Sequence, residues 1–261
     1  MEFETVLLER SEGIAVIRMN RPREMNTLNF ALTRELLKSL EICWDDAATR
    51  VVVITGSGKA FCAGGDVAAF RNAADIGDAT RQMTKDFDPL ISGIRRIPKP
   101  VMAMINGICM GAGLSLAAAC DLRLCSTSAV FRQAYTSVGL TPDGAWGLHL
   151  PLLIGFGRAS DLAFSDPVID ARKAFEIGLV GDVIDDADLE RVTMKKAQRL
   201  ASGPLKAFAI AKDNLNRAML GVLENQLEQE RLGIMSAGRT ADAREGINAV
   251  LEKRKPVFKG E

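Results

Sequence analysis

The spacing of hydrophobic residues changes along the chain, from short apolar runs to helical repeats. Five runs rich in Val, Ile and Leu are bounded by Gly, Pro, Asn or Ser, which is typical of β-strands. Between them, apolar residues recur at three- and four-residue spacing, which indicates amphipathic helices. This alternation predicts an α/β fold. The predicted strands are Val6–Glu9, Ile14–Met19, Val51–Thr55, Val101–Ile105 and Leu122–Cys125, and the predicted helices among them are Thr27–Asp46 and Thr80–Ile97.

Strand signals nearly vanish after about Ser160. The C-terminal third is therefore predicted to be a helical appendage, with Gly203, Pro204 and Gly238 at helix ends. An apolar stripe formed by Leu223, Leu227 and residues 230–235 fits either the core of the chain or a contact between subunits. The predicted helices are Arg158–Phe164, Ala171–Ile177, Asp186–Ala201, Pro204–Ala218, Leu220–Ala237 and Thr240–Glu252.

Charge and composition exclude several classes of partner. Lys and Arg together number 33, as do Asp and Glu, and 48% of the residues are hydrophobic. No bulk charge favours nucleic acid or a membrane surface, so an anionic ligand would need a local group of basic residues. The first residues lack the basic start and apolar core of a signal peptide, so we expect a cytoplasmic protein. The apolar stretch Val101–Ala119 is rich in glycine and predicts strand, loop and buried helix rather than a membrane span.

Cysteine and histidine give no metal-binding pattern. The five cysteines include no CxxC pair, and His149 is the single histidine, so we expect no metal site. The cysteines mostly lie in apolar runs, where a buried small hydrophobe is the usual role of a thiol. His149 lies in a Leu-flanked run and is interpreted as a structural residue.

Two glycine-rich turns follow predicted strands and suggest a site for developing negative charge. They span residues 56–66, after VVVIT, and residues 106–113, after VMAMI. Glycine permits close backbone approach, and amides at a helix start direct partial positive charge at an anion. Two such turns can supply a pair of N–H donors to a carbonyl oxygen that becomes negative during a reaction.

Four segments stand out in order along the chain, namely NRPREMNTLN (Asn20–Asn29), VVVITGSGKAFCAGGDV (Val51–Val67), PKPVMAMINGICMGAGLSLAAACDLRLC (Pro98–Cys125) and GLTPDGAWGLHLPLLIG (Gly139–Gly155). They resemble the signature blocks of the enoyl-CoA hydratase/isomerase, or crotonase, family. The ending EKRKPVFKG matches as well, so the resemblance spans essentially the whole chain.

The resemblance implies a crotonase-like spiral of β-β-α units, with an acyl-CoA-binding core over residues 1–200. Residues 201–261 would form a helical oligomerisation region that builds homotrimers or hexamers. Coenzyme A would enter as part of the acyl-CoA substrate, without a separate cofactor. The amides of Gly65 and Ala112 would hold the thioester oxygen, with Ala112 in place of a more frequent glycine.

The resemblance also implies where the substrate lies. Arg23 and Lys259 match positions near the CoA phosphates and nucleotide, although either would also fit a solvated surface cation. Small and apolar side chains after the first glycine-rich turn are expected to surround the acyl group. The implied CoA or substrate contacts are Arg23, Met25, Phe61, Ala63, Asp66, Val67, Tyr135, Phe258 and Lys259, and the expected acyl-group neighbours are Ala68, Ala69, Ala73, Met83, Phe87 and Trp146.

The acid/base positions depart from the hydratase pattern. Ser115 and Tyr135 stand where typical hydratases of the family carry two glutamates, and a phenol with a pKa of about 10 is a poor replacement. Asp143 is a different carboxylate, at a position where isomerases of the family use a single acid. On spacing alone, Pro142-Asp143-Gly144 is also a strong turn signal, and Asp143 would then cap the next helix.

These positions favour an enoyl-CoA isomerase in which Asp143 transfers a proton and Gly65 and Ala112 stabilise the enolate. An enoyl-CoA hydratase is the second reading. A thioester hydrolase or dehalogenase is the third, and the histidine of the dehalogenases is missing near Asp88. A non-catalytic acyl-CoA-binding protein is the fourth.

Overall fold

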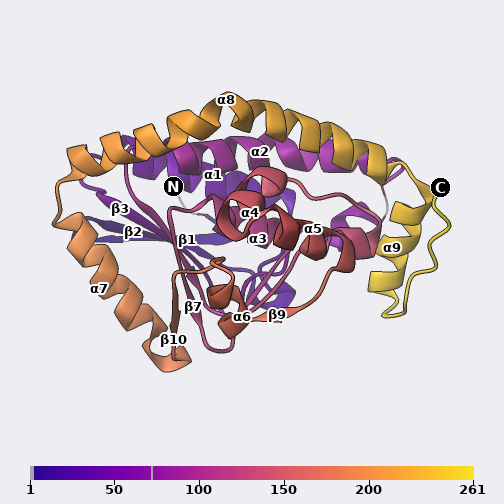
Figure 1. Ribbon diagram of the computed structural model, residues 1–261, viewed down its shortest axis with the longest axis horizontal. Helices are drawn as coiled ribbons and strands as arrows, with labels where there is room; N and C mark the ends of the chain where they lie inside the picture. The colour runs from indigo at the N-terminus through magenta and orange to yellow at the C-terminus, as the bar shows by residue number, and fades with distance from the viewer. Residues whose placement is uncertain (1–2, 72) are drawn as a thin grey trace.

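A six-stranded sheet forms the centre of the protein (Figure 1). The computed structural model describes residues 3–71 and 73–261. The strand order is β1-β2-β3-β5-β7-β10, and every neighbouring pair is parallel except the antiparallel pair β1 and β2. The strands are β1 (Val6–Ser11), β2 (Ile14–Met19), β3 (Val51–Gly56), β5 (Val101–Ile105), β7 (Leu122–Ser126) and β10 (Asp182–Ile184).

A second, four-stranded sheet follows the order β4-β6-β8-β9. Each of β4, β6 and β8 comes soon after a strand of the first sheet, and a helix follows β4 and β6 before the chain returns to that sheet. This repetition confirms the predicted spiral of β-β-α units. The strands are β4 (Ala60–Cys62), β6 (Ile108–Met110), β8 (Val130–Arg132) and β9 (Ile169–Asp170).

Helices cover both faces of the six-stranded sheet. Strand β3 is buried on both faces, so Val52 and Ile54 pack in one hydrophobic core, while Val51 and Val53 pack in another. The second core includes Leu189, Ala197 and Ala201 of α7. The helices are α1 (Phe30–Asp45), α2 (Ile76–Arg96), α3 (Ala112–Ala119), α4 (Trp146–Ile154), α5 (Phe156–Ser165), α6 (Ala171–Glu176), α7 (Leu189–Ala201), α8 (Leu205–Gly238) and α9 (Ala241–Leu251).

The C-terminal region is helical, as predicted, but two of its predicted helices are one. The segments predicted at 204–218 and 220–237 form the single helix α8, which lies along α2 (Figure 1). Leu223, Leu227 and Ile234 of the apolar stripe are buried in the larger core. These three side chains therefore pack inside their own chain. The predicted boundary between an acyl-CoA-binding core (residues 1–200) and an oligomerisation region (residues 201–261) stays a prediction.

Two predictions about apolar segments are confirmed. All five cysteines are free and buried, as small hydrophobes are. Residues 101–119 form β5, the short strand β6 and the fully buried helix α3. Among the helices of the described residues, none has the length and hydrophobicity that a membrane crossing requires.

Candidate active site

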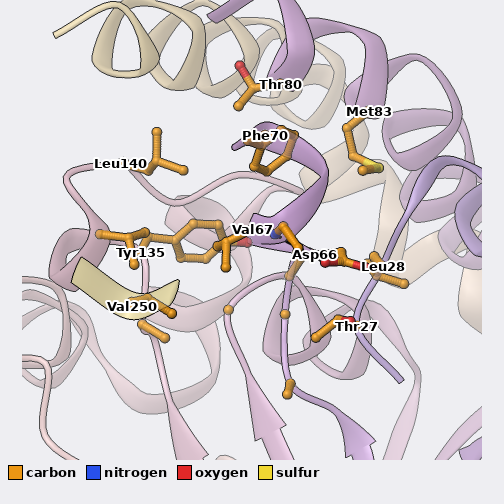
Figure 2. Close-up of a pocket in the computed structure, with 18 of the residues that line it drawn as sticks. Thr27, Leu28, Asp66, Val67, Phe70, Thr80, Met83, Tyr135, Leu140 and Val250 are labelled. Atoms are coloured by element: carbon orange, nitrogen blue, oxygen red, sulfur yellow. Dashed lines mark hydrogen bonds between the residues drawn. The ribbon is translucent and has the colours of Figure 1, made fainter. Parts of the chain in front are cut away.

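A cavity of about 470 Å³ lies where the glycine-rich turns meet α2 and the C-terminal helices. Figure 2 shows Asp66 and Val67 between Leu28 on one side and Tyr135 on the other. Residues as distant in sequence as 23 and 251 line this cavity. Apolar side chains supply much of its wall, namely Leu28, Val67, Phe70, Met83, Phe87, Val138, Leu140, Ile234, Val250 and Leu251.

The two glycine-rich turns come together because the strands before them are neighbours. Strands β4 and β6 are parallel, with Cys62 opposite Cys109, so the turns that follow leave from the same edge of the sheet. At Gly64, φ is +106° and an added Cβ would lie 3.2 Å from the Met110 carbonyl oxygen. The close contact and the left-handed backbone both require glycine at this position.

The amides of Gly65 and Ala112 lie on these turns, and both residues line the cavity. Ala112 is the first residue of α3, where backbone N–H groups have no partner within the helix. In the described part of the chain, neither N–H donates a hydrogen bond to a protein acceptor. The site thus presents two unpaired donors, one of which lies at the positive end of a helix.

The carboxylate of Asp66 has structural partners. It pairs with the Arg21 guanidinium at 3.0 Å and accepts a hydrogen bond from the Ala68 N–H. The backbone around it is fixed as well, because the Leu28 N–H donates to the Gly64 carbonyl and the Asp66 N–H donates to the Leu28 carbonyl. These bonds hold Gly65 in place and leave the Asp66 carboxylate engaged.

Asp143 places a carboxylate on the cavity wall in a buried environment. The Tyr135 hydroxyl donates to Asp143 Oδ1 at 2.6 Å, and the Ser115 hydroxyl donates to the Asp143 backbone oxygen at 2.8 Å. Ser115 Oγ and Tyr135 Oη are themselves 3.1 Å apart. The two residues that replace the expected glutamates therefore both hold Asp143.

Burial sets the ionisation state of the Asp143 carboxylate. It raises the pKa of Asp143 to about 6, although the hydrogen bond from Tyr135 partly offsets the rise. Burial and the neighbouring Asp143 charge raise the pKa of Tyr135 well above its ordinary value, so Tyr135 keeps its proton and donates it in a hydrogen bond. The N-cap residue of α4 is Ala145, and the hydrogen bond to the Asp143 carboxylate comes from Tyr135 and not from an N–H of α4, so Asp143 does not cap this helix.

Comparison with known proteins identifies the family. The sequence profile of enoyl-CoA hydratase/isomerase matches residues 9–261. The chain belongs to this family. It is 38% identical over 260 residues to a probable enoyl-CoA hydratase of Rhodobacter capsulatus, covering all of both chains. It is 35% identical over 265 residues to 1,2-epoxyphenylacetyl-CoA isomerase of Escherichia coli, covering 100% of this chain and 99% of that one.

The fold agrees with this enoyl-CoA hydratase/isomerase assignment. The crystal structure of an enoyl-CoA hydratase from Mycobacterium avium subsp. paratuberculosis superimposes with a TM-score of 0.91 at 29% identity. The match covers 99% of this chain and 100% of that chain. The spiral and the helical C-terminal region are thus features of a known enzyme family.

The residues predicted to contact CoA fall into two groups in this family member. Arg23, Met25, Ala63, Asp66, Val67 and Tyr135 line the cavity. Phe61 is completely buried and does not line it, because β4 directs its middle side chain into the core. Phe258 lines a separate depression, and the Lys259 N–H donates to Asp242, so contact of these two residues with CoA stays a prediction.

The acyl-group neighbours were only partly anticipated. Ala68, Met83 and Phe87 line the cavity, whereas Ala69, Ala73 and Trp146 are not among its lining residues. Sequence reasoning missed several other side chains because most of them come from α2, α8, α9 and the loop before α4, and no local pattern marks them. These missed residues include Phe70, Thr80, Leu140, Ile234, Val250 and Leu251.

His149 takes no part in the cavity. It is buried in α4 and does not line the cavity wall. Burial, together with the positive charges of Arg95 and Arg123, lowers the pKa of His149 to about 3, so it is neutral. Within residues 3–71 and 73–261, no group of His, Cys, Asp or Glu side chains has the arrangement of a metal site.

Proposed function

We propose that this protein is an enoyl-CoA isomerase that moves a double bond into conjugation with a thioester. Asp143 removes a proton from the carbon between the thioester and the double bond of a 3-enoyl-CoA. The electron pair of that C–H bond moves onto the thioester oxygen and forms a dienolate. Asp143 then returns the proton two carbons further along, which yields the 2-enoyl-CoA without any other reactant.

One observation carries the proposal: Asp143 is a buried cavity carboxylate whose hydrogen-bond partner is a phenol and not a cation. The other cavity carboxylates are Glu24, which is exposed at the mouth, and Asp66, which is paired with Arg21. A general base works best when its pKa is near the working pH. The pKa of about 6 at Asp143 meets this requirement.

The free amides of Gly65 and Ala112 support the same proposal. A dienolate carries its charge on the thioester oxygen, and each preorganised donor to such an oxygen is worth roughly 3 kcal/mol. Arg23 lies at the exposed mouth, where its positive charge suits the phosphates of CoA. The E. coli relative is also named an isomerase, in its case of 1,2-epoxyphenylacetyl-CoA.

Enoyl-CoA hydratase is the second candidate, because the R. capsulatus relative carries that name. Addition of water to a conjugated double bond benefits from two groups that orient the water and exchange a proton. Ser115 and Tyr135, which occupy the expected positions, both direct their hydroxyls at Asp143. The isomerase therefore agrees better with the hydrogen bonds of the site.

An assay with two substrates tests the proposal. The protein is incubated with a 3-enoyl-CoA and, separately, with a 2-enoyl-CoA, while conjugation, hydration and free thiol are followed. We expect conjugation of the 3-enoyl-CoA to be the fastest process. Faster hydration of the 2-enoyl-CoA would favour the hydratase, and release of thiol would favour a hydrolase. Binding without turnover would indicate an acyl-CoA-binding protein.

A further inference from the structure

Helix α4 begins directly after the turn that carries Asp143, and its own sequence provides no cap. Its N-cap residue is Ala145, which is among the poorest residue types at that position. The first N–H groups of a helix need acceptors from elsewhere. Here the Gly147 N–H donates to Oε1 of Glu230 at 2.8 Å. Helix α8, 83 residues away in sequence, thus caps α4.

The capping contact is tight and buried. Glu230 is 9% exposed, and its Oε1 also accepts from the Gln226 side-chain amide at 2.7 Å. An added Cβ on Gly147 would lie 2.9 Å from Glu230 Oε1, so a larger residue at this position would displace the Glu230 carboxylate. The second carboxyl oxygen, Oε2, is buried and lacks a hydrogen-bond partner among the residues that the structure describes. A solvated surface glutamate would show neither feature.

The chain between the cap and Asp143 is short and constrained. Both Gly144 and Ala145 have left-handed backbone, with φ of 68° and 59°. On the other side of Asp143, Thr141 lies against Gly233 of α8. A Cβ added to Gly233 would lie 3.3 Å from the methyl group of Thr141. Helix α8 therefore touches both ends of the segment 141–147, and a shift at Gly147 would move the Asp143 carboxylate.

We propose that Glu230 is a positioning residue of the reaction, which caps α4 from α8 and thereby fixes the turn that directs the Asp143 carboxylate into the cavity. The inference rests on the proposed role of Asp143 as the base. Glu230 itself does not line the cavity, so it acts through Asp143 and not on the substrate.

The charge of Glu230 gives the proposal a pH signature. Burial raises the pKa of Glu230 to about 7. The Asp143 charge adds to this rise, while hydrogen bonds from Gln226 and Gly147 partly offset it. The pKa of Asp88, on α2, is also raised, to about 8. Burial is the main cause, and the charges of Asp143 and Glu230 add to it. Arg231 lowers and Glu228 raises the pKa of Asp88. Between about pH 6 and pH 7, Asp143 is thus mostly ionised, whereas Glu230 and Asp88 mostly keep their protons.

Ionisation of Glu230 at higher pH would place a second negative charge near the base and near the dienolate. Like charges disfavour each other in a buried site. We therefore expect the isomerisation rate of the wild type to decline above about pH 7, where Glu230 loses its proton. Removal of the charge at this position would remove that part of the decline.

Three variants of α8 test the inference. In Glu230→Ala the cap is lost, and we expect kcat to fall about 10- to 100-fold with little change in KM, because small displacements of a catalytic group are costly. Glu230→Gln keeps an oxygen for Gly147, so we expect kcat within about threefold of the wild type and a smaller decline at high pH. Glu224→Gln, an exposed position on the same helix, is the matched control and should leave both unchanged.

Crystal structures of the Glu230 variants give a readout that is independent of the reaction. We expect the Tyr135–Asp143 hydrogen bond to break in Glu230→Ala and to persist in Glu230→Gln. An intact Asp143 geometry in Glu230→Ala, or an unchanged pH profile in Glu230→Gln, would overturn the inference. A wild type without isomerase activity would contradict the proposed function but not the inference about Glu230. The crystal structures would still show whether Glu230 positions Asp143.

Discussion

Asp143 and its two hydroxyl neighbours are the place where single atoms decide the chemistry of this protein. Ser115 and Tyr135 are too weakly acidic to act as the missing glutamates, yet both donate to Asp143. The presence of Ser115 and Tyr135 in place of two glutamates therefore removes two carboxylates and also adds two hydrogen bonds to Asp143. It leaves Asp143 as the buried carboxylate of the cavity, with its side chain held by Tyr135 and its backbone oxygen held by Ser115.

The hydroxyl of Tyr135 should tune the pH at which the enzyme becomes active. Its hydrogen bond stabilises the ionised Asp143 and lowers a pKa that burial has raised. In Tyr135→Phe we therefore expect the acid limb of the kcat/KM profile for isomerisation to move to higher pH, by about one unit. A limb that stays in place, or moves to lower pH, would show that Tyr135 does not act on Asp143.

The buried Asp143 should also reduce the stability of the fold. Its pKa is about 6 in the folded protein against an ordinary 3.8, so the folded state holds the proton more strongly than the unfolded state. The favourable contribution of this group is complete below about pH 4 and is lost as pH rises through 6. At pH 7.5 the ionised form costs about 3 kcal/mol.

We expect Asp143→Asn to be more stable than the wild type at pH 7.5 and nearly equal to it at pH 4. Asn retains an oxygen that can accept the Tyr135 hydrogen bond but carries no charge. Urea unfolding at a fixed protein concentration measures the difference. Equal unfolding midpoints at pH 7.5 would mean that Asp143 is not buried in its charged form.

At the scale of residues, the sequence allowed the positions of Asp143, Gly65 and Ala112 to be predicted from the spacing of the family blocks. The partners of Asp143 could not be predicted in the same way. The contact between Tyr135 and Asp143 depends on how the chain turns back before α4, and Glu230 reaches this region from α8. Such contacts join segments that share no local pattern.

At the scale of elements, long apolar runs were the reliable signal. The buried strands β2 and β5 have the predicted limits, because continuous burial leaves a clear apolar run. Strands β4, β6 and β8 have only three residues each and show no periodicity to recognise. The break predicted near residue 219 is absent, because packing of α8 along α2 maintains the helix across Gly221.

The start of α3 offers a selective test of the oxyanion donors. Ala112 is the first residue of the helix, where proline is tolerated because that N–H has no helical partner. Ala112→Pro should therefore lose about 100-fold or more in kcat for isomerisation, with little loss of stability. Ala112→Gly retains the N–H and is the matched control. Equal activity of the two variants would contradict the role of this amide.

At the scale of the whole molecule, large apolar side chains remain on the surface. Phe156, Phe164 and Phe175, on α5 and α6, are 78%, 88% and 53% exposed. Large exposed apolar side chains often mark a contact between subunits. They lie on α5 and α6, outside the predicted oligomerisation region at residues 201–261, so the surface that joins the subunits stays a prediction.

We expect the purified protein to have three or six times the chain mass of 28.2 kDa in solution. Sedimentation or light scattering measures this directly. Phe164→Glu tests whether α5 takes part in the contact, because a charge placed there would lower the measured mass. A wild-type protein with the mass of a single chain would contradict the expected assembly.

The central claim is that one carboxylate, Asp143, moves the proton during double-bond isomerisation. The most direct measurement compares the rate at which wild type and Asp143→Asn convert a saturating 3-enoyl-CoA into the conjugated 2-enoyl-CoA. Binding of the acyl-CoA by the variant is checked by its thermal shift. We predict that the variant binds but loses at least about 100-fold in kcat. Equal rates in the two proteins would contradict the claim.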